Sequence, residues 1–315
     1  MANVKPGASV APGVDAKSSR RERGEIYVTR APGYRLPEAM RLGAVRLEVA
    51  DLERSLDYYE KVIGLRVINR AGRTVALGPV DENTVLVGLS EVLGAAPHQY
   101  NERLGLYHFA ILLPSRAALG RFVAHLAEIN AHAGQADHYV SEAFYLRDPD
   151  GLGIEVYADR PREKWPVVDG KLSMGLDPVD MDSLLKEAGG VPWTGMPPGT
   201  RIGHVHLHVG DLVEAERFFH NVLGLDLTAS MPSALFMSAG GYHHHLGTNT
   251  WARGAPPATD ADARLLEWEI IVPTKKDADE AARHVKAAGY PVKDESGEWI
   301  LTDPWGTSLR LVPET

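Results

Sequence analysis

Three histidines alternate within one short stretch of this 315-residue sequence, "IGHVHLHVGDL" at 202–212. Because successive side chains of a β-strand point to opposite faces, His204, His206 and His208 would all project from one face of a strand. Imidazoles gathered in this way can ligate a metal ion or transfer protons near neutral pH. The sequence has no cysteine, so thiolate ligands and disulfides are excluded.

A second copy of this stretch lies earlier in the chain and lacks the histidines. The segment "LGAVRLEVADLERSLDYYEKVIGLRV" (42–67) matches "IGHVHLHVGDLVEAERFFHNVLGLDL" (202–227) without gaps. Both segments predict a strand, an amphipathic helix and a second strand, with Asp51 and Asp211 as the helix N-caps. A repeat of this length, spaced by about 160 residues, indicates a duplicated domain.

A weaker repeat inside each half completes the organisation. Residues 107–126 and 267–285 again predict an alternating strand, a turn and a helix, and short strand candidates follow them, ending at 148–157 and 303–312. The chain is therefore predicted to be an α+β protein of four βαβββ modules in two domains, with curved mixed sheets around a metal-binding cavity. The expected modules span 42–92, 105–158, 202–250 and 265–313.

The parts of the chain outside the modules differ from them in composition. Residues 1–38 are rich in small, polar and charged residues and are expected to form a flexible arm. Residues 39–160 and 201–315 are the two predicted domains, with two modules each. Residues 161–200 contain proline, glycine and one short helix candidate, and are expected to form the linker between the domains.

Net charge and hydropathy restrict the partners of the protein. A net charge of −9 argues against nucleic-acid binding, which requires a basic face. No apolar run approaches the ~18 residues of a membrane span, and the N-terminus lacks the apolar core of a signal peptide. These features predict a cytoplasmic protein with neither a nucleic-acid nor a membrane partner. A homodimer or higher homo-oligomer is left open.

Aligning the sequences of the four modules with one another identifies candidate metal ligands. The first strands place four residues at one equivalent inward position: Ala44, His108, His204 and Glu267. The last strands of modules two and four place Glu155 opposite Arg310. Two histidines and one carboxylate on one face, with other coordination positions open, form the facial triad of non-haem Fe(II) enzymes, so His108, His204 and Glu155 are the predicted ligands. Glu267 beside Arg310 instead predicts an ion pair in a site that holds no metal.

Five strings of the sequence are distinctive: "GHVHL", "YHFAILLP", "DHYVSEAFYL", "DPDGLGIEVYADRP" and "GGYHHHLGTNTW". Together they resemble strings of a known family, the extradiol ring-cleavage branch of the vicinal oxygen chelate superfamily. The resemblance implies a catechol 2,3-dioxygenase-like enzyme that cleaves a small aromatic diol with O2. It implies Fe(II), or Mn(II) as the alternative, on His108, His204 and Glu155. In the best-known members the triad lies within the last two modules, whereas here it requires modules two and three to pair.

The resemblance also implies roles for residues around the metal. His244, in "YHHHLG" at 242–247, matches the acid/base histidine, although the register leaves His243 or His245 as alternatives. Tyr145 matches a tyrosine that hydrogen-bonds the substrate oxygen, and His138 is expected to support the site. Four further residues are expected to line the substrate pocket: His206, His243, Asn249 and Trp251.

Two other functions remain open on this fold. A glyoxalase-like metal-dependent isomerase or lyase would use four protein ligands, and the fourth position here offers histidines or Leu246 rather than an acid. A non-catalytic resistance protein that binds a small molecule would generally lack an inward triad. Catechol, a biphenyl diol and a hydroquinone all remain candidate substrates, because their ring substituents are recognised by apolar pocket residues that the sequence pattern does not identify.

Overall fold

The computed structural model describes residues 28–99 and 101–314. Most of the expected N-terminal arm lies outside these residues. Its described part is packed against the second half of the chain: Thr29 pairs with Leu227, and Arg35 forms an ion pair with the buried Asp226. None of the described helices is both long and apolar enough to cross a membrane.

Four modules with the predicted order of elements are present, which confirms the expected βαβββ organisation. The first contains β1 (Arg41–Val49), α1 (Leu52–Tyr58), its π-helical continuation η1 (Tyr59–Ile63), β2 (Arg66–Ala71), β3 (Thr74–Gly78) and β4 (Val87–Glu91). The second contains β5 (Gly105–Leu112), α2 (Arg116–Glu128), β6 (Gly134–Asp137), β7 (Ser141–Arg147) and β8 (Gly153–Asp159). The third contains β11 (Arg201–His208), α4 (Leu212–Ala215), η3 (Glu216–Val222), β12 (Asp226–Met231), β13 (Ala234–Ser238) and β14 (Leu246–Asn249). The fourth contains β15 (Arg264–Val272), α5 (Lys275–Ala287), β16 (Val292–Glu295), β17 (Glu298–Thr302) and β18 (Ser308–Pro313).

The module helices begin where the sequence predicts. The Asp51 and Asp211 side chains accept from the backbone N–H groups of Arg54 and Glu214, each at 3.0 Å, and so satisfy an amide that the first helical turn leaves free. Both helices then widen into π-helical turns, η1 and η3. The predicted N-caps are thus confirmed.

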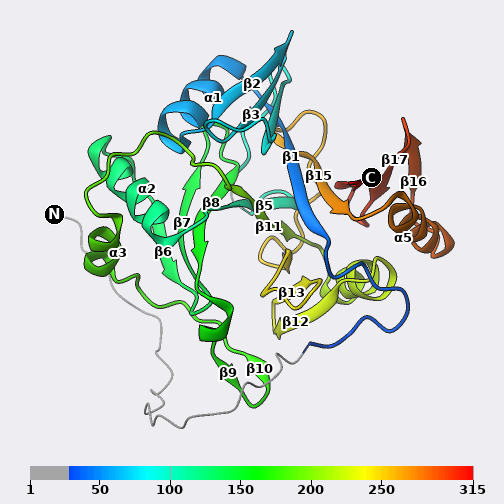
Figure 1. Ribbon diagram of the computed structural model, residues 1–315. Coiled ribbons are helices and arrows are strands. Elements are labelled where there is room, and N and C mark those ends of the chain that lie inside the picture. The colour runs from blue at the N-terminus through cyan, green and yellow to red at the C-terminus, as the bar shows by residue number, and fades with distance from the viewer. Residues whose placement is uncertain (1–27, 100, 315) are drawn as a thin grey trace.

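Each of the two eight-stranded sheets combines one module from each half of the chain. The first sheet has the order β16-β17-β18-β15-β1-β4-β3-β2, and the second sheet has the order β12-β13-β14-β11-β5-β8-β7-β6. The antiparallel pairing of β5 with β11 confirms that modules two and three share a sheet, as a shared ligand set requires. Modules one and four pair through β1 and β15, and the two sheets lie side by side at the centre of the molecule (Figure 1).

Strand alternation separates a helix-facing side from a histidine-bearing side in the second sheet. Val205, Leu207 and Val209 of the β11 segment are buried in the main apolar core, which also contains Phe218 and Phe219 of η3. Burying each such side chain contributes roughly 1.5–3 kcal/mol, so this face sets the register of the strand. The histidines between these residues therefore point to the concave side, as predicted.

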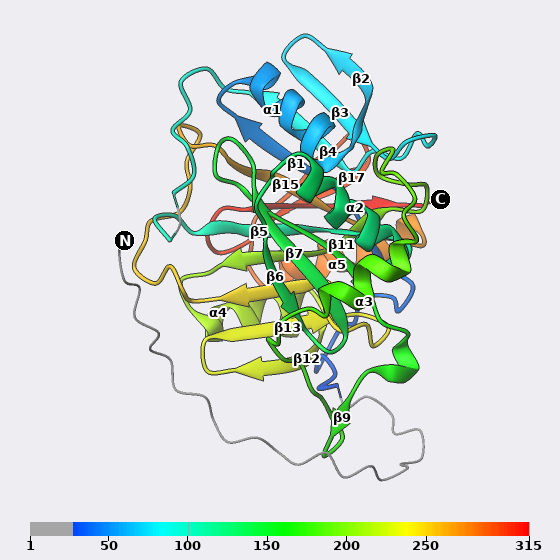
Figure 2. The same ribbon diagram turned by 90° about the vertical axis from the view of Figure 1, so that its left-hand side faces the viewer.

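The connection between the two halves is folded and anchored. It contains η2 (Arg162–Lys164), a projecting hairpin of β9 (Val167–Val168) and β10 (Lys171–Leu172), and α3 (Met181–Ala188) (Figures 1 and 2). Helix α3 packs on α2, where Gly120 is required because a Cβ there would lie 2.5 Å from the Leu184 carbonyl oxygen.

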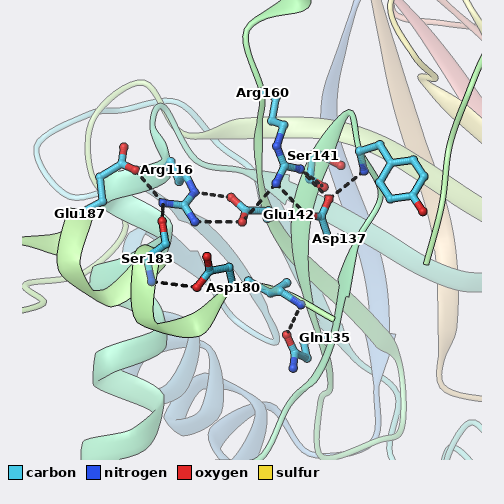
Figure 3. Close-up of polar contacts among 11 residues, drawn as sticks. Arg116, Gln135, Asp137, Ser141, Glu142, Arg160, Asp180, Ser183 and Glu187 are labelled. Carbon is cyan, nitrogen blue, oxygen red and sulfur yellow. Dashed lines mark hydrogen bonds and ion pairs between the residues drawn. The ribbon is translucent and has the colours of Figure 1, made fainter. Parts of the chain in front are cut away.

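Polar contacts also fasten this connection to the second sheet (Figure 3). Arg116 of α2 pairs with the buried Glu142 of β7 and, at 2.7 Å, with Glu187 of α3. The backbone N–H of Val179 donates to Gln135 Oε1 at 2.9 Å. These contacts hold the segment around α3 against the sheet that carries the histidines.

Candidate active site

Three ligand atoms converge on the concave side of the second sheet. His108 Nε2 lies 3.0 Å from Glu155 Oε2, and His204 Nε2 lies 3.2 Å from each of these atoms. All three residues are buried, and they form the one such group of histidine and acidic side chains found in the described part of the chain. Ligands placed 2.1 Å from one ion and at right angles to each other lie about 3.0 Å apart, against about 3.4 Å for a tetrahedron. The separations of 3.0–3.2 Å fall within this range, so the three atoms can ligate one divalent ion, and three ligands leave further coordination positions open.

Three neighbouring strands bring these atoms together. Ala110 of β5 lies directly between Glu155 of β8 and His204 of β11, and His108 follows on the same face of β5, two residues earlier. The small side chain of Ala110 leaves room beneath the three ligand atoms. Since β8 and β11 are far apart in sequence, the site exists only when modules two and three pair.

The electrostatics of the triad suit a metal ligand set. Burial opposes the ionisation of Glu155, yet the adjacent His204 and His108 imidazoles hold the pKa of its carboxyl well below its usual range. Burial lowers the pKa of His108, against the opposing effect of Glu155. An ionised carboxylate and a neutral imidazole are the protonation states that bind a metal.

His244 faces the triad, and a hydrogen-bonded chain behind it determines its tautomer. Its ring centroid lies 4.1 Å from that of His204. His243 donates from Nε2 to Asp159 Oδ1 at 2.8 Å, so in neutral His243 the Nδ1 atom must accept. That Nδ1 lies 2.8 Å from His244 Nδ1, which therefore donates and leaves His244 Nε2 as the proton acceptor. Burial, with His204 and His243 close by, lowers the pKa of His244 well below its usual range.

Similar reasoning gives the tautomer of His138. Its Nδ1 lies 2.9 Å from the Gly175 carbonyl oxygen and must donate to it. Its Nε2 then accepts from the Tyr145 hydroxyl, 2.5 Å away. Tyr145 stands opposite Glu155 in the pairing of β7 with β8, and its ring centroid lies 5.6 Å from that of His108. Burial, with the charge of Glu155 nearby, raises the pKa of Tyr145 well above its usual value, so the hydroxyl keeps its proton.

A cavity of about 430 Å³ opens beside the triad. The triad, His138, Tyr145, His206, His244 and Trp251 line it. His243 and Asn249 lie behind its wall rather than in it. Asn249 is buried and hydrogen-bonds His206 Nε2 at 3.0 Å and His208 Nδ1 at 2.7 Å, so it orients both rings.

The cavity also contains residues that the sequence does not single out. Tyr107 should point away from the metal because it precedes the inward His108, but a β-bulge turns it into the cavity: His206 opposes His108 while Leu207 opposes Leu106. Phe236 of β13 and residues 174–176, from the connection between modules two and three, also line the cavity. The close packing of Gly247 on His206, where a Cβ would lie 2.8 Å from the ring, is one signal of crowding at this site.

The equivalent position in the first sheet holds an ion pair. Arg310 Nε lies 2.7 Å from Glu267 Oε1, and Arg46 Nε lies 3.1 Å from the same oxygen. Arg310 also pairs with Glu295 at 2.6 Å and Glu298 at 2.9 Å. The ion pair predicted between Glu267 and Arg310 is confirmed. A guanidinium occupies the place where a second metal ion would need a carboxylate.

Comparison with known proteins gives a consistent result. The family model described as "Glyoxalase/Bleomycin resistance protein/Dioxygenase superfamily" matches residues 41–156 and 201–310. A catechol-2,3-dioxygenase of Bacillus subtilis (strain 168) is 44% identical over 271 residues, which cover 85% of this chain and 95% of that protein. A lactoylglutathione lyase of Escherichia coli O157:H7 is 26% identical over 130 residues, 38% of this chain and 94% of that protein. Glyoxalase I of Zea mays has a similar fold, with a TM-score of 0.52 and 18% identity, over 87% of this chain and 92% of that one.

Proposed function

Since the chain belongs to the glyoxalase/bleomycin resistance protein/dioxygenase superfamily and is a catechol-2,3-dioxygenase-like enzyme, we propose that it is an extradiol dioxygenase that opens a catechol-type ring with O2. We assign the metal to His108, His204 and Glu155 and identify it as Fe(II), with Mn(II) as the alternative that uses the same ligand types. The observation that carries the proposal is the convergence of these three donors beside a cavity of about 430 Å³. A bound Fe(II) would supply coordination positions for the diol and O2 and a path for electrons between them.

Residues of the chain itself would accept and return the protons of the reaction. His244 Nε2 is the free acceptor on the cavity side, so it takes a proton from the diol and can return it when the ring opens. The resulting imidazolium is stabilised through His243 by the carboxylate of Asp159. The Tyr145 hydroxyl, which donates to His138, is placed to accept a hydrogen bond from a diol O–H.

The alternative functions fit the site less well. A glyoxalase-like isomerase needs four protein ligands, whereas the described group has three members. A non-catalytic binding protein would not require a proton-accepting nitrogen held toward the metal-ligand candidates, as His244 Nε2 is. The hydrogen-bonded chain from Asp159 to His244 favours the enzyme.

Anaerobic metal analysis followed by oxygen uptake with a panel of catechols tests the proposal. We expect His108→Ala, His204→Ala and Glu155→Ala each to abolish iron retention. A fully active His204→Ala protein would refute the ligand assignment. If the iron-loaded wild-type protein consumed oxygen with none of the catechols, the proposed activity would be refuted.

A further inference from the structure

The described residues of the cavity wall farther from the triad are mostly apolar, and none of them is a lysine or an arginine. Beyond the histidines, tyrosines and Glu155, its large side chains are Val140, Met174, Leu176, Met231, Phe236 and Trp251. Ser233 also lines the cavity, but its Oγ accepts from Trp251 Nε1 at 3.0 Å. No lysine or arginine is among the described lining residues. A ligand carboxylate placed here would be desolvated without a cation to pair with it.

The apolar character continues outward to the rim. Leu176, Trp251 and Met231 are 80%, 44% and 43% exposed, and they are three of the nine large apolar side chains that the described surface leaves exposed. They come from three separate segments: the connection between modules two and three, the loop after β14 and the end of β12. Such a concentration of exposed apolar surface at one cavity mouth is typical of a binding site.

The volume of the cavity exceeds the need of an unsubstituted substrate. The roughly ten non-hydrogen atoms of catechol and O2 fill about 300 Å³ if each takes the ~30 Å³ of a water molecule in the liquid. The cavity measures about 430 Å³. The cavity therefore has room for a substituent on the ring, and the rim offers apolar surface beyond it.

We propose that the preferred substrate is a catechol with an uncharged apolar substituent, such as an alkyl chain or an aryl ring, that reaches the rim of Leu176, Met231 and Trp251. This inference rests on the proposed function. It also predicts that catechols with a carboxylate substituent are poor substrates. Arg147 lines an adjoining cavity, which shares Tyr107, His108 and Tyr145, but it is not among the described residues that line the cavity beside the triad.

The test compares kcat/KM for catechol, 4-propylcatechol, 2,3-dihydroxybiphenyl and 3,4-dihydroxyphenylacetate with the iron-loaded wild-type protein. Each buried methylene should increase kcat/KM about fourfold, so we expect at least about a tenfold preference for 4-propylcatechol over catechol. The carboxylated compound should fall at least about a hundredfold below catechol. A preference for the carboxylated compound, or no gain from the apolar substituents, would overturn the inference while leaving ring cleavage of catechol intact. Failure to cleave any of the four compounds would instead refute the proposed function.

Substitutions at the rim locate the effect. We expect Leu176→Ala and Met231→Ala each to reduce the preference for 4-propylcatechol over catechol about threefold to fivefold. Leu176→Arg should raise kcat/KM for the carboxylated compound relative to catechol, because it supplies the missing cation. The matched control is Leu93→Ala, which removes an equally apolar side chain that is 64% exposed and does not line the cavity. An equal change in the control variant, or unchanged preference in both rim variants, would show that the rim does not contact the substrate.

Discussion

The two related sheets allow the metal assignment to be tested with an internal control. Glu155 and Glu267 are both buried carboxylates on inward strands, but the first faces two histidines and the second faces Arg310 and Arg46. We predict that Glu155→Gln abolishes the stabilisation that a divalent metal ion gives the protein, whereas Glu267→Gln retains it. The reason is that an amide cannot supply the anionic ligand, while the Glu267 site holds no metal in either protein.

The size of the effect follows from linkage between binding and folding. At a free Mn(II) concentration 100 times Kd, a single site stabilises the folded protein by about 2.7 kcal/mol. An unfolding entropy of about 2.1 cal/mol/K for each of the 315 residues converts this to a rise in Tm of about 4 °C. If Glu155→Gln weakens binding 100-fold, the stabilisation at the same concentration falls to about 0.4 kcal/mol, and the rise to less than about 1 °C.

The assay is thermal unfolding with and without Mn(II), so it does not depend on catalytic activity. Each variant is compared with its own metal-free Tm, because Glu267→Gln also leaves Arg310 with fewer partners and is expected to lower stability by itself. Equal Mn(II)-induced shifts in the wild-type protein and in Glu155→Gln would refute the ligand assignment. Loss of the shift in Glu267→Gln alone would place the metal in the other sheet.

Three further predictions concern the proton acceptor, pH dependence and packing. His244→Ala should lower kcat about 10²- to 10⁴-fold while the Mn(II)-induced rise in Tm persists, and an unchanged kcat would exclude a proton-transfer role. Burial raises the pKa of the Asp148 carboxyl from 3.8 to about 7, so between these pH values the folded protein keeps a proton that the unfolded chain releases. This proton binding stabilises the folded state in acid, and the stabilisation is lost as pH rises toward 7. Asp148→Asn should therefore gain stability relative to wild type as pH rises from about 4 to about 8 in urea unfolding, whereas a difference independent of pH would contradict this. Gly203→Ala should lower the free energy of unfolding by about 1–3 kcal/mol or more, because the added Cβ would lie 1.8 Å from Tyr157 Oη. The control is Gly33→Ala, where a Cβ meets nothing within 4 Å. Equal urea midpoints for the two variants would refute the packing argument.

Much of the candidate site could be predicted because the proposed ligands lie on strands with regular alternation. Once β11 is recognised as a strand with Val205 and Leu207 on its core face, the inward direction of His204 follows from backbone geometry alone. The internal repeat then links His204 to His108 without any knowledge of the tertiary structure. The same comparison predicts the ion pair between Glu267 and Arg310.

Features that depend on breaks in this regularity could not be predicted. The bulge that turns Tyr107 into the cavity arises from the register between β5 and β11, which belong to different halves of the chain. The histidines at 243–245 precede β14 in a turn, where no alternation specifies which ring faces inward. Contacts with Asp159 and His204 decide this for His243 and His244.

The sequence by itself therefore determined the modules, the helix N-caps and the identity of the metal-ligand candidates, because each depends on local periodicity and on repetition along the chain. Only the tertiary structure decided which histidine of 243–245 faces the triad, that Tyr107 turns into the cavity, and that residues 174–176 line it. These features depend on contacts between segments distant in sequence. The energy of such contacts comes from packing and hydrogen bonding that no local pattern encodes.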